Sequence, residues 1–237
     1  MGHRYAQLQA HQSSVSLHVA ALLGIPWHAL AVATAHRADE IFVGDEHGTL
    51  GFAIDPTAYS AHDAFMFKGA NAVMWATGVR LASLVRHKSG EIMYFTRSSL
   101  VASIGGVIVV NPTPKQVDAM RPNIDYFLLT PSREKPDAWG EIHCPHPIVL
   151  TYHDEPGDAG AWLRQLLTKY LCSDEALKTT PLFSDAQGRP YTHAFLDRML
   201  KWVLERCFGA AAAWVYTWHS HRVGLATRFI QRACPTQ

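Results

Sequence analysis

Four side chains in this sequence have the chemistry needed to hold a phosphate group: Arg80, Lys135, His219 and Arg222. A guanidinium offers parallel N–H groups to two phosphate oxygens, and lysine and histidine add charge or carry a proton. Arg80 lies in an otherwise apolar stretch, where an arginine is costly to bury unless it meets an anion. His219 and Arg222 open a predicted helix, and a helix N-terminus itself attracts anions. Together these residue types favour phosphate binding.

Each of these residues also has an ordinary structural explanation. A lone arginine more often lies on the surface or in a structural ion pair, and a lone loop lysine is usually solvated. A lone histidine is usually a packing residue whose hydrogen bonds are satisfied. Hydrophobic periodicity cannot show whether the four residues converge in space, so the phosphate site is a hypothesis that the fold has to test.

The composition is that of a globular protein without a strong electrostatic signature. Apolar residues make up 48% of the 237 residues and charged residues 17%, which excludes a disordered chain. The net charge of +1 gives no overall footprint for nucleic acid. Residues 196–237 differ, because six basic residues there face only two acidic ones. A basic region suits a phosphate-rich partner, although such runs are more often a solvated helix face.

Neither the cysteines nor the N-terminal region indicates secretion or a membrane span. The four cysteines are scattered without a C-x-x-C pair, which argues against a disulfide framework or a zinc finger and is typical of a reducing compartment. Residues 1–12 lack the layout of a signal peptide. Residues 17–35 are apolar for nearly the length of a span but include His18 and Pro26, so buried helical turns are predicted there.

From about residue 60 the sequence predicts a mixed α+β domain that is mainly helical. Apolar residues spaced near 3.6 predict a helix over residues 64–86. Thr113, Asp158 and Thr192 are predicted to cap three further helices, and Thr113 is followed by a proline and by a glutamine at the capping-box position. A last helix is predicted to begin near Ser220.

Short apolar runs predict a small antiparallel sheet built around a hairpin, and a run of small residues at 210–213 predicts a linker. Asp55, followed by proline, marks a domain boundary. Residues 1–58 are therefore predicted to be an N-terminal extension of unclear fold, and residues 59–237 the main domain. The predicted strands are residues 92–95, 107–110, 126–129 and 148–150.

The order of these motifs resembles the catalytic domain of the tyrosine recombinases, the family of the phage integrases. Residues 77–80 read T-G-V-R, residues 135–140 read K-P-D-A-W-G in the predicted hairpin, and residues 218–222 read W-H-S-H-R. The match is closest to the Crypton-like and DIRS-like recombinases of mobile elements and algae. Residues 181–190 are similar to the family's segment before its penultimate helices, and the resemblance covers about residues 62–237.

The resemblance implies a recombinase catalytic-domain fold, which is a mainly helical core with a small antiparallel β-hairpin sheet. It also implies four catalytic residues for DNA recombination or integration. Arg80 and Arg222 would hold the scissile phosphate and stabilise its transition state. Lys135 would protonate the leaving 5′ oxygen, and His219 would assist proton transfer or phosphate binding. The lysine and both arginines would contact the DNA.

The same resemblance implies the reaction partners. A tyrosine would attack the phosphate to form a 3′-phosphotyrosyl link, so strand exchange would need no metal or other cofactor. The substrate would be double-stranded DNA, bound by a tetramer of a complete family member. The expected location is the nucleus or nucleoid, with no membrane partner.

The sequence departs from the family pattern at three points. Ser83 stands where the family often has an acidic residue that supports the first arginine, and no N-terminal DNA clamp is recognisable in residues 1–60. No tyrosine follows Arg222 within residues 223–237, and Tyr216 matches a structural aromatic of the family. We therefore expect a fragment or a degenerate copy that lacks the nucleophile and does not cleave DNA as it stands.

Two other functions fit parts of the same pattern. A non-catalytic DNA-binding module would keep Arg80 and Arg222 as phosphate contacts without chemistry. A metal-binding protein could use two histidine pairs at ligand-like spacing, although zinc needs three or four ligands in tetrahedral geometry. These pairs are His219 with His221 and His143 with His146.

Overall fold

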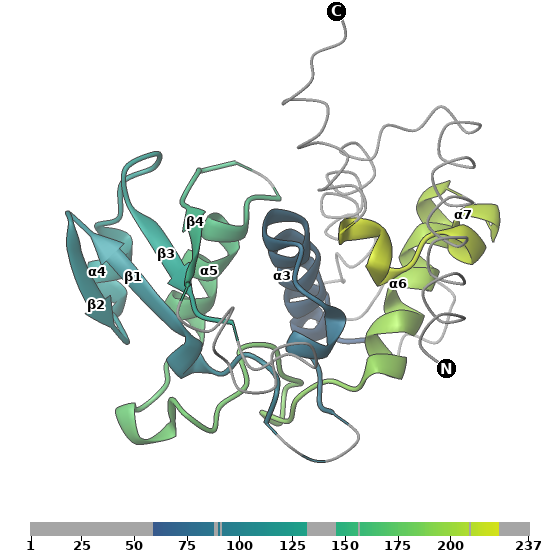
Figure 1. Cartoon of the computed structure of the whole chain (residues 1–237), viewed down its shortest axis with the longest axis horizontal. Helices are drawn as coiled ribbons and strands as arrows, with labels where there is room; N and C mark the ends of the chain where they lie inside the picture. The colour runs from purple at the N-terminus through teal and green to yellow at the C-terminus, as the bar shows by residue number, and fades with distance from the viewer. Residues whose placement is uncertain are drawn as a thin grey trace, which may run out of the picture.

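The computed structural model describes residues 59–87, 90, 92–131, 146–155, 157–208 and 210–222 (Figure 1). This part of the chain has a mixed α+β fold in which helices pack beside a four-stranded antiparallel sheet. The predicted N-terminal extension, residues 1–58, lies outside the described residues, as does Lys135. The helices are α3 (Ala61–Thr77), α4 (Pro114–Asp118), α5 (Ala159–Lys169), α6 (His193–Phe208) and α7 (Ala210–Val215), and the strands are β1 (Leu100–Ile104), β2 (Val107–Val110), β3 (Tyr126–Leu129) and β4 (Ile148–Thr151).

Local sequence sets both ends of helix α3. The Ser60 side chain accepts a hydrogen bond from the Asp63 N–H, and the Asp63 carboxylate accepts one from the Ser60 N–H at 2.9 Å, which completes a capping box. At the other end Gly78 adopts a left-handed backbone with φ 65° and donates to a carbonyl of the last turn at 2.8 Å. The helix predicted over residues 64–86 is therefore wrong beyond Thr77, because a left-handed residue ends it.

The sheet has the strand order β2-β1-β3-β4, and all neighbouring strands are antiparallel. The strands predicted at 126–129 and 148–150 are confirmed as β3 and β4. The strand predicted at 107–110 is confirmed as β2, but it is a largely exposed edge strand. The strand predicted at 92–95 is wrong, and the sheet instead uses residues 100–104 as β1.

Residues 92–95 anchor a loop to the core instead of pairing within the sheet. The Phe95 N–H donates to the Ser83 carbonyl at 2.8 Å, and the Phe95 carbonyl accepts from the Leu182 N–H at 2.8 Å. The Phe95 side chain is buried. The Phe95 backbone groups are thus already used by the 3-10 helix Leu81–Ser83 and by the segment around Leu182, and neither group is left for a strand ladder.

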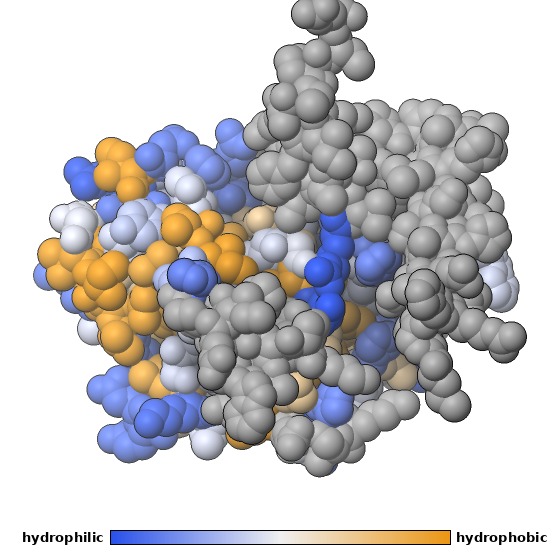
Figure 2. All heavy atoms as spheres, viewed as in Figure 1, coloured by the Kyte–Doolittle hydropathy of each residue, from blue (hydrophilic) through white to orange (hydrophobic). Residues whose placement is uncertain are grey.

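Alternation along the strands gives the sheet one buried side and one more exposed side. The cross-strand neighbours Ala102, Phe127 and Leu150 are buried, and α5 packs on β3 and β4. Figure 2 shows apolar residues gathered on the surface over the sheet, at the left of the view. A row of aliphatic side chains crosses all four strands on the more exposed side: Val110, Val101, Leu128 and Val149.

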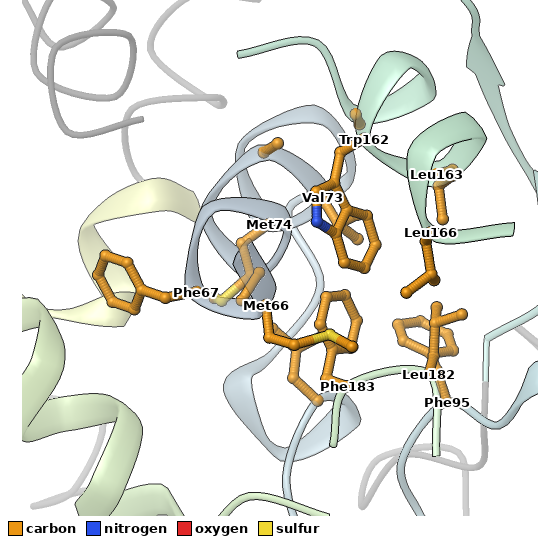
Figure 3. Packing of buried hydrophobic residues seen from close by; sticks show 14 of the residues in the cluster. Met66, Phe67, Val73, Met74, Phe95, Trp162, Leu163, Leu166, Leu182 and Phe183 are labelled. Carbon is orange, nitrogen blue, oxygen red and sulfur yellow. The ribbon is translucent and has the colours of Figure 1, made fainter. Parts of the chain in front are cut away.

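Helix α3 supplies buried side chains to opposite sides of the core (Figure 3). On one side lies Trp162 of α5, which stacks on Phe183 with ring centroids 5.1 Å apart and planes 4° from parallel. Phe67 points to the opposite side of the helix. Gly69 allows the close approach of Trp162, because a Cβ at position 69 would lie only 1.8 Å from the indole ring.

Three predicted helix caps are confirmed. Thr113 forms a complete capping box at α4, with proline at the first helical position. Asp158 and Thr192 accept hydrogen bonds from N–H groups in the first turns of α5 and α6 at 2.8 and 3.2 Å. The linker predicted at 210–213 is wrong, because its alanines, which have the highest helix propensity, begin α7. Among the described residues, no helix combines the length and apolar character that crossing a membrane requires.

A buried carboxylate beside the turn between β1 and β2 stabilises the sheet in a pH-dependent way. Asp125 is 2% exposed and accepts hydrogen bonds from the N–H groups of Gly105 at 2.8 Å and Arg121 at 2.7 Å. Burial alone would raise the pKa of Asp125, but these bonds and the Arg121 charge hold the pKa below its usual value. The stabilisation is present above the unfolded-state pKa of about 3.9 and is lost as the pH falls through the lower folded-state pKa.

We expect Asp125→Asn to lower the free energy of unfolding by about 1–3 kcal/mol near neutral pH, because the amide leaves buried N–H groups without a full acceptor. The variant should also lose part of the wild-type stability change in acid. Urea unfolding at neutral pH and below the usual carboxylate pKa measures both effects. Asp118→Asn is the control, since exposed Asp118 only pairs with Arg164 at 3.1 Å and should cost less than about 1 kcal/mol. Equal losses in the two variants would contradict the prediction.

Candidate phosphate-binding site

The turn after α3 directs Arg80 away from the helix. The Thr77 hydroxyl donates to the carbonyl four residues earlier at 2.6 Å and accepts from the Val79 N–H at 3.2 Å. Next to left-handed Gly78, these bonds fix the exit of the chain. Arg80 then has an extended backbone (φ −79°, ψ 150°) and precedes the short 3-10 helix Leu81–Ser83. The half-buried Arg80 thus lies just beyond the end of α3 and not within an apolar helix, as the sequence had suggested.

The backbone around Ser83 supports this turn. Its N–H donates to the Arg80 carbonyl at 2.9 Å, and its own carbonyl accepts from Phe95. Ser83 is buried. Ser83, at the position where the family often has an acidic residue, thus holds the Arg80 backbone through a main-chain hydrogen bond.

Residues 218–222 are helical and are joined to α3 by a buried polar pair. Nε2 of His221 lies 3.0 Å from Oδ1 of Asn71, and Nδ2 of Asn71 donates to the Phe67 carbonyl at 3.0 Å. Because the Asn71 nitrogen is used in this way, its oxygen accepts a bond from His221, so Nε2 carries the proton of the neutral ring and Nδ1, 3.3 Å from the Trp218 carbonyl, carries none. Asn71 is 1% exposed and His221 is 8% exposed. The bond connects positions 150 residues apart.

Aromatic contacts reinforce this attachment. The Trp218 ring meets Phe67 edge-on, with centroids 5.6 Å apart, and lies nearly parallel to His221 at 5.4 Å. The Ser220 N–H donates to the Thr217 carbonyl at 2.8 Å, and the Thr217 N–H donates to Ser220 Oγ at 3.1 Å. These bonds start the helical segment at Trp218, two positions before the predicted start.

This attachment brings His219 and Arg222 close to Arg80. Partial desolvation by the surrounding protein, followed by the positive charges of Arg222 and Arg80, lowers the pKa of His219. Because a charge shifts a pKa mainly at short range, both arginines lie in the neighbourhood of His219, and we call these three residues the Arg80 cluster. His219 is exposed and both arginines are half-buried, so the cluster lies at the surface.

The cluster has the chemistry of an anion site. Each guanidinium can form two parallel hydrogen bonds to phosphate oxygens, and the lowered pKa favours neutral His219 at neutral pH, the form that accepts a proton. Three of the four predicted residues are thus brought together. The fourth, Lys135, lies outside the described residues.

Tyr216 does not have the properties of a nucleophile. Its side chain is 2% exposed, and burial raises its pKa. A buried phenol that resists ionisation is poorly suited to attack a phosphate at the surface. This fits the structural role expected for Tyr216.

The geometry disfavours His221 as a metal ligand. Its ring is buried, and its Nδ1 and Nε2 lie 3.3 Å from the Trp218 carbonyl and 3.0 Å from Asn71. Binding a metal would break the bond that holds residues 218–222 on α3. Within the described parts of the chain, no three or more His, Cys, Asp or Glu side chains form a group able to hold a metal ion. His146 is exposed, and its predicted partner His143 lies outside the described residues.

Sequence reasoning missed Asn71 as a positioning residue. Its signal was a lone amide among apolar residues of a helix, four positions after Phe67. Such a residue is costly to bury without partners. The missing information was the partner itself, because His221 lies far away along the chain.

Comparison with known proteins gives no relative for this chain. No family model matches it, and neither does any curated protein or solved structure.

Proposed function

We propose that this chain is a DNA-binding domain of the tyrosine-recombinase type, in which Arg80, His219 and Arg222 bind one backbone phosphate of double-stranded DNA. The observation that carries the proposal is the shared electrostatic environment of these three residues, which come from two distant segments. The mixed α+β fold with a small antiparallel sheet is compatible with a recombinase-like helical core.

On this proposal the two arginines neutralise charge that builds up on the phosphate during strand transfer. His219, neutral at neutral pH, is able to move a proton at a phosphate oxygen. Lys135 would act as the general acid on the leaving oxygen. The nucleophilic tyrosine is assigned to no described residue. A complete enzyme of this type would assemble as a tetramer on DNA in the nucleus or nucleoid.

Duplex binding tests the phosphate site directly. We expect Arg80→Ala and Arg222→Ala each to weaken binding of a fluorescent duplex by about tenfold or more, since each removes charge-assisted hydrogen bonds worth about 1.5–3 kcal/mol. Each variant should also reduce the slope of log affinity against log salt by about one, because one fewer counterion is released. Fluorescence anisotropy across a salt series measures both.

Arg189→Ala is the matched control, because Arg189 pairs with Asp185 at 2.8 Å beside the opposite end of α3. Circular dichroism establishes that each variant is folded. If wild-type affinity ignores salt, or if Arg189→Ala weakens binding as much as Arg80→Ala does, the proposed site is wrong.

A second experiment separates an enzyme from a non-catalytic DNA-binding module. Nicked duplex substrates trap the covalent phosphotyrosyl link of a recombinase. A protein–DNA adduct on a denaturing gel that Arg222→Ala abolishes would indicate catalysis. Salt-dependent binding without an adduct fits both a recombinase-type chain that lacks its tyrosine and the non-catalytic module, in which the arginines are phosphate contacts alone.

A further inference from the structure

Arg97 is a buried arginine that lies apart from the candidate site, just before β1 and next to the end of α5. Arg97 opens the short 3-10 helix Arg97–Ser99 and is only 6% exposed. Its Nη2 donates to the Tyr170 carbonyl at 2.5 Å. Its Nη1 is buried and has no hydrogen-bond partner among the described residues. A guanidinium carries five N–H donors, so one carbonyl leaves most of its capacity unused.

The charge of Arg97 also lacks a carboxylate partner within the described part of the chain. Burial lowers the pKa of Arg97, and the one nearby group that opposes this shift is the Cys172 thiol. Arginine is almost never fully buried unless it is paired, because an isolated charge in the interior is expensive. An anion beside Arg97 would therefore lower the cost of burying its charge.

A small cavity borders Arg97. Its volume is about 180 Å³, and its wall includes Arg97, Asn111, Thr113, Leu171 and Cys172. Pockets for drug-sized ligands start near about 300 Å³, while a water molecule occupies roughly 30 Å³. The cavity is thus suited to a small ion or a single phosphate group with a few waters, and it is too small to enclose a whole nucleotide.

One carboxylate reaches the rim of this cavity. Asn111 Nδ2 donates to the Cys172 carbonyl at 2.9 Å and to the Asp174 carboxylate at 2.7 Å. Asp174 is exposed and is not among the groups that shift the pKa of Arg97. It therefore does not supply the missing counter-charge.

We propose that the cavity beside Arg97 binds a small tetrahedral oxyanion of the phosphate class, which pairs with the buried guanidinium. Such an ion supplies a negative charge and acceptor oxygens beside the guanidinium. This site is separate from the Arg80 cluster and does not depend on the function proposed for it.

A substitution that supplies the counter-charge internally tests the proposal without removing Arg97. Cys172→Asp places a carboxylate beside the guanidinium in nearly the same volume, and Cys172→Asn is its neutral counterpart. We expect inorganic phosphate to raise the melting temperature of the wild type and of Cys172→Asn in a saturable way, beyond sodium chloride of equal ionic strength. Cys172→Asp should melt higher than Cys172→Asn without phosphate and should no longer respond to it.

The proposal is overturned if phosphate has no effect beyond ionic strength, or if Cys172→Asp responds as strongly as the wild type. The failure of Cys172→Asp to melt above Cys172→Asn would equally contradict an unmet charge at Arg97. Calorimetric titration of phosphate into the wild type gives an independent affinity.

The oxyanion could be free phosphate or a phosphate of the DNA backbone. Duplex binding by Cys172→Asp distinguishes them, with Ser173→Asp as the control that adds the same charge at an exposed neighbouring position. A selective loss of duplex affinity in Cys172→Asp identifies a DNA phosphate. Equal affinities, with the phosphate response lost only in Cys172→Asp, identify a free ion. The experiment stands even if the Arg80 variants bind duplex normally.

Discussion

Gly69→Ala is expected to lower the free energy of unfolding by about 3 kcal/mol, although alanine is the better helix former by about 1 kcal/mol. The reason is the added methyl group, which would lie 1.8 Å from the Trp162 indole. That ring cannot easily move, because it stacks on Phe183 and its Nε1 donates to the Phe65 carbonyl at 2.8 Å. The steric cost therefore exceeds the gain in helix propensity.

Urea unfolding of a double-mutant cycle measures this effect. In a Trp162→Leu background the smaller side chain makes room, so Gly69→Ala should become nearly neutral or stabilising there. The double mutant should then be less destabilised than the sum of the two single mutants, by about the cost of the clash. If Gly69→Ala stabilises the wild type as propensity alone predicts, the packing of α5 on α3 is not as described.

The fall in stability below neutral pH is expected to come largely from one buried ring. Burial lowers the pKa of His221 to about 4, whereas an unfolded histidine titrates near 6.5. The unfolded state therefore takes up a proton first as the pH falls. Stability should decline from pH 6.5 toward pH 4 by about 3 kcal/mol in total from this residue.

His221→Gln isolates this contribution. The glutamine amide can still donate to Asn71 but does not titrate, so the variant should lose little stability between about pH 6.5 and 5, where most carboxylates remain ionised. Urea unfolding at several pH values measures the two curves. Parallel curves for wild type and His221→Gln would contradict the neutral buried ring.

Features that depend on a few adjacent residues could be predicted from the sequence. The helix caps were predicted correctly at Thr113, Asp158 and Thr192. A cap depends only on a side-chain oxygen and on a free N–H two or three residues later, so the local sequence is enough to predict it. The strands at 126–129 and 148–150 were also predictable, since turn residues bound each apolar run.

Other features could not be predicted from apolar spacing, because they depend on backbone conformation or on partners elsewhere in the chain. The helical spacing of apolar residues continues past Thr77, but Gly78 takes a left-handed conformation that spacing does not encode. Residues 92–95 are as apolar as a strand, yet Phe95 is held by loops around Ser83 and Leu182. The edge strand β2 keeps its apolar residues exposed, which periodicity would assign to the interior.

For the candidate site, the residue types could be predicted from the sequence but their arrangement in space could not. The residue types of Arg80, His219 and Arg222 suggested an anion site, but their approach depends on Asn71 and His221, which no local pattern connects. Arg97 is a site residue that no feature of the sequence would have selected. Its sequence context, between a threonine and two serines, gives no sign that it is buried.

The bond between Asn71 and His221 spans 150 residues, and this separation orders the events of folding. Contacts between distant positions must overcome a large loop-closure entropy, so they form late. On a ribosome adding about 5–20 residues per second, α3 emerges roughly 8–30 seconds before the segment that completes the Arg80 cluster. Throughout that interval Phe67 and Asn71 present an unfilled apolar and polar surface on a nascent chain. The Arg80 cluster therefore cannot form until residues 218–222 have left the ribosome, whereas α3 is available much earlier.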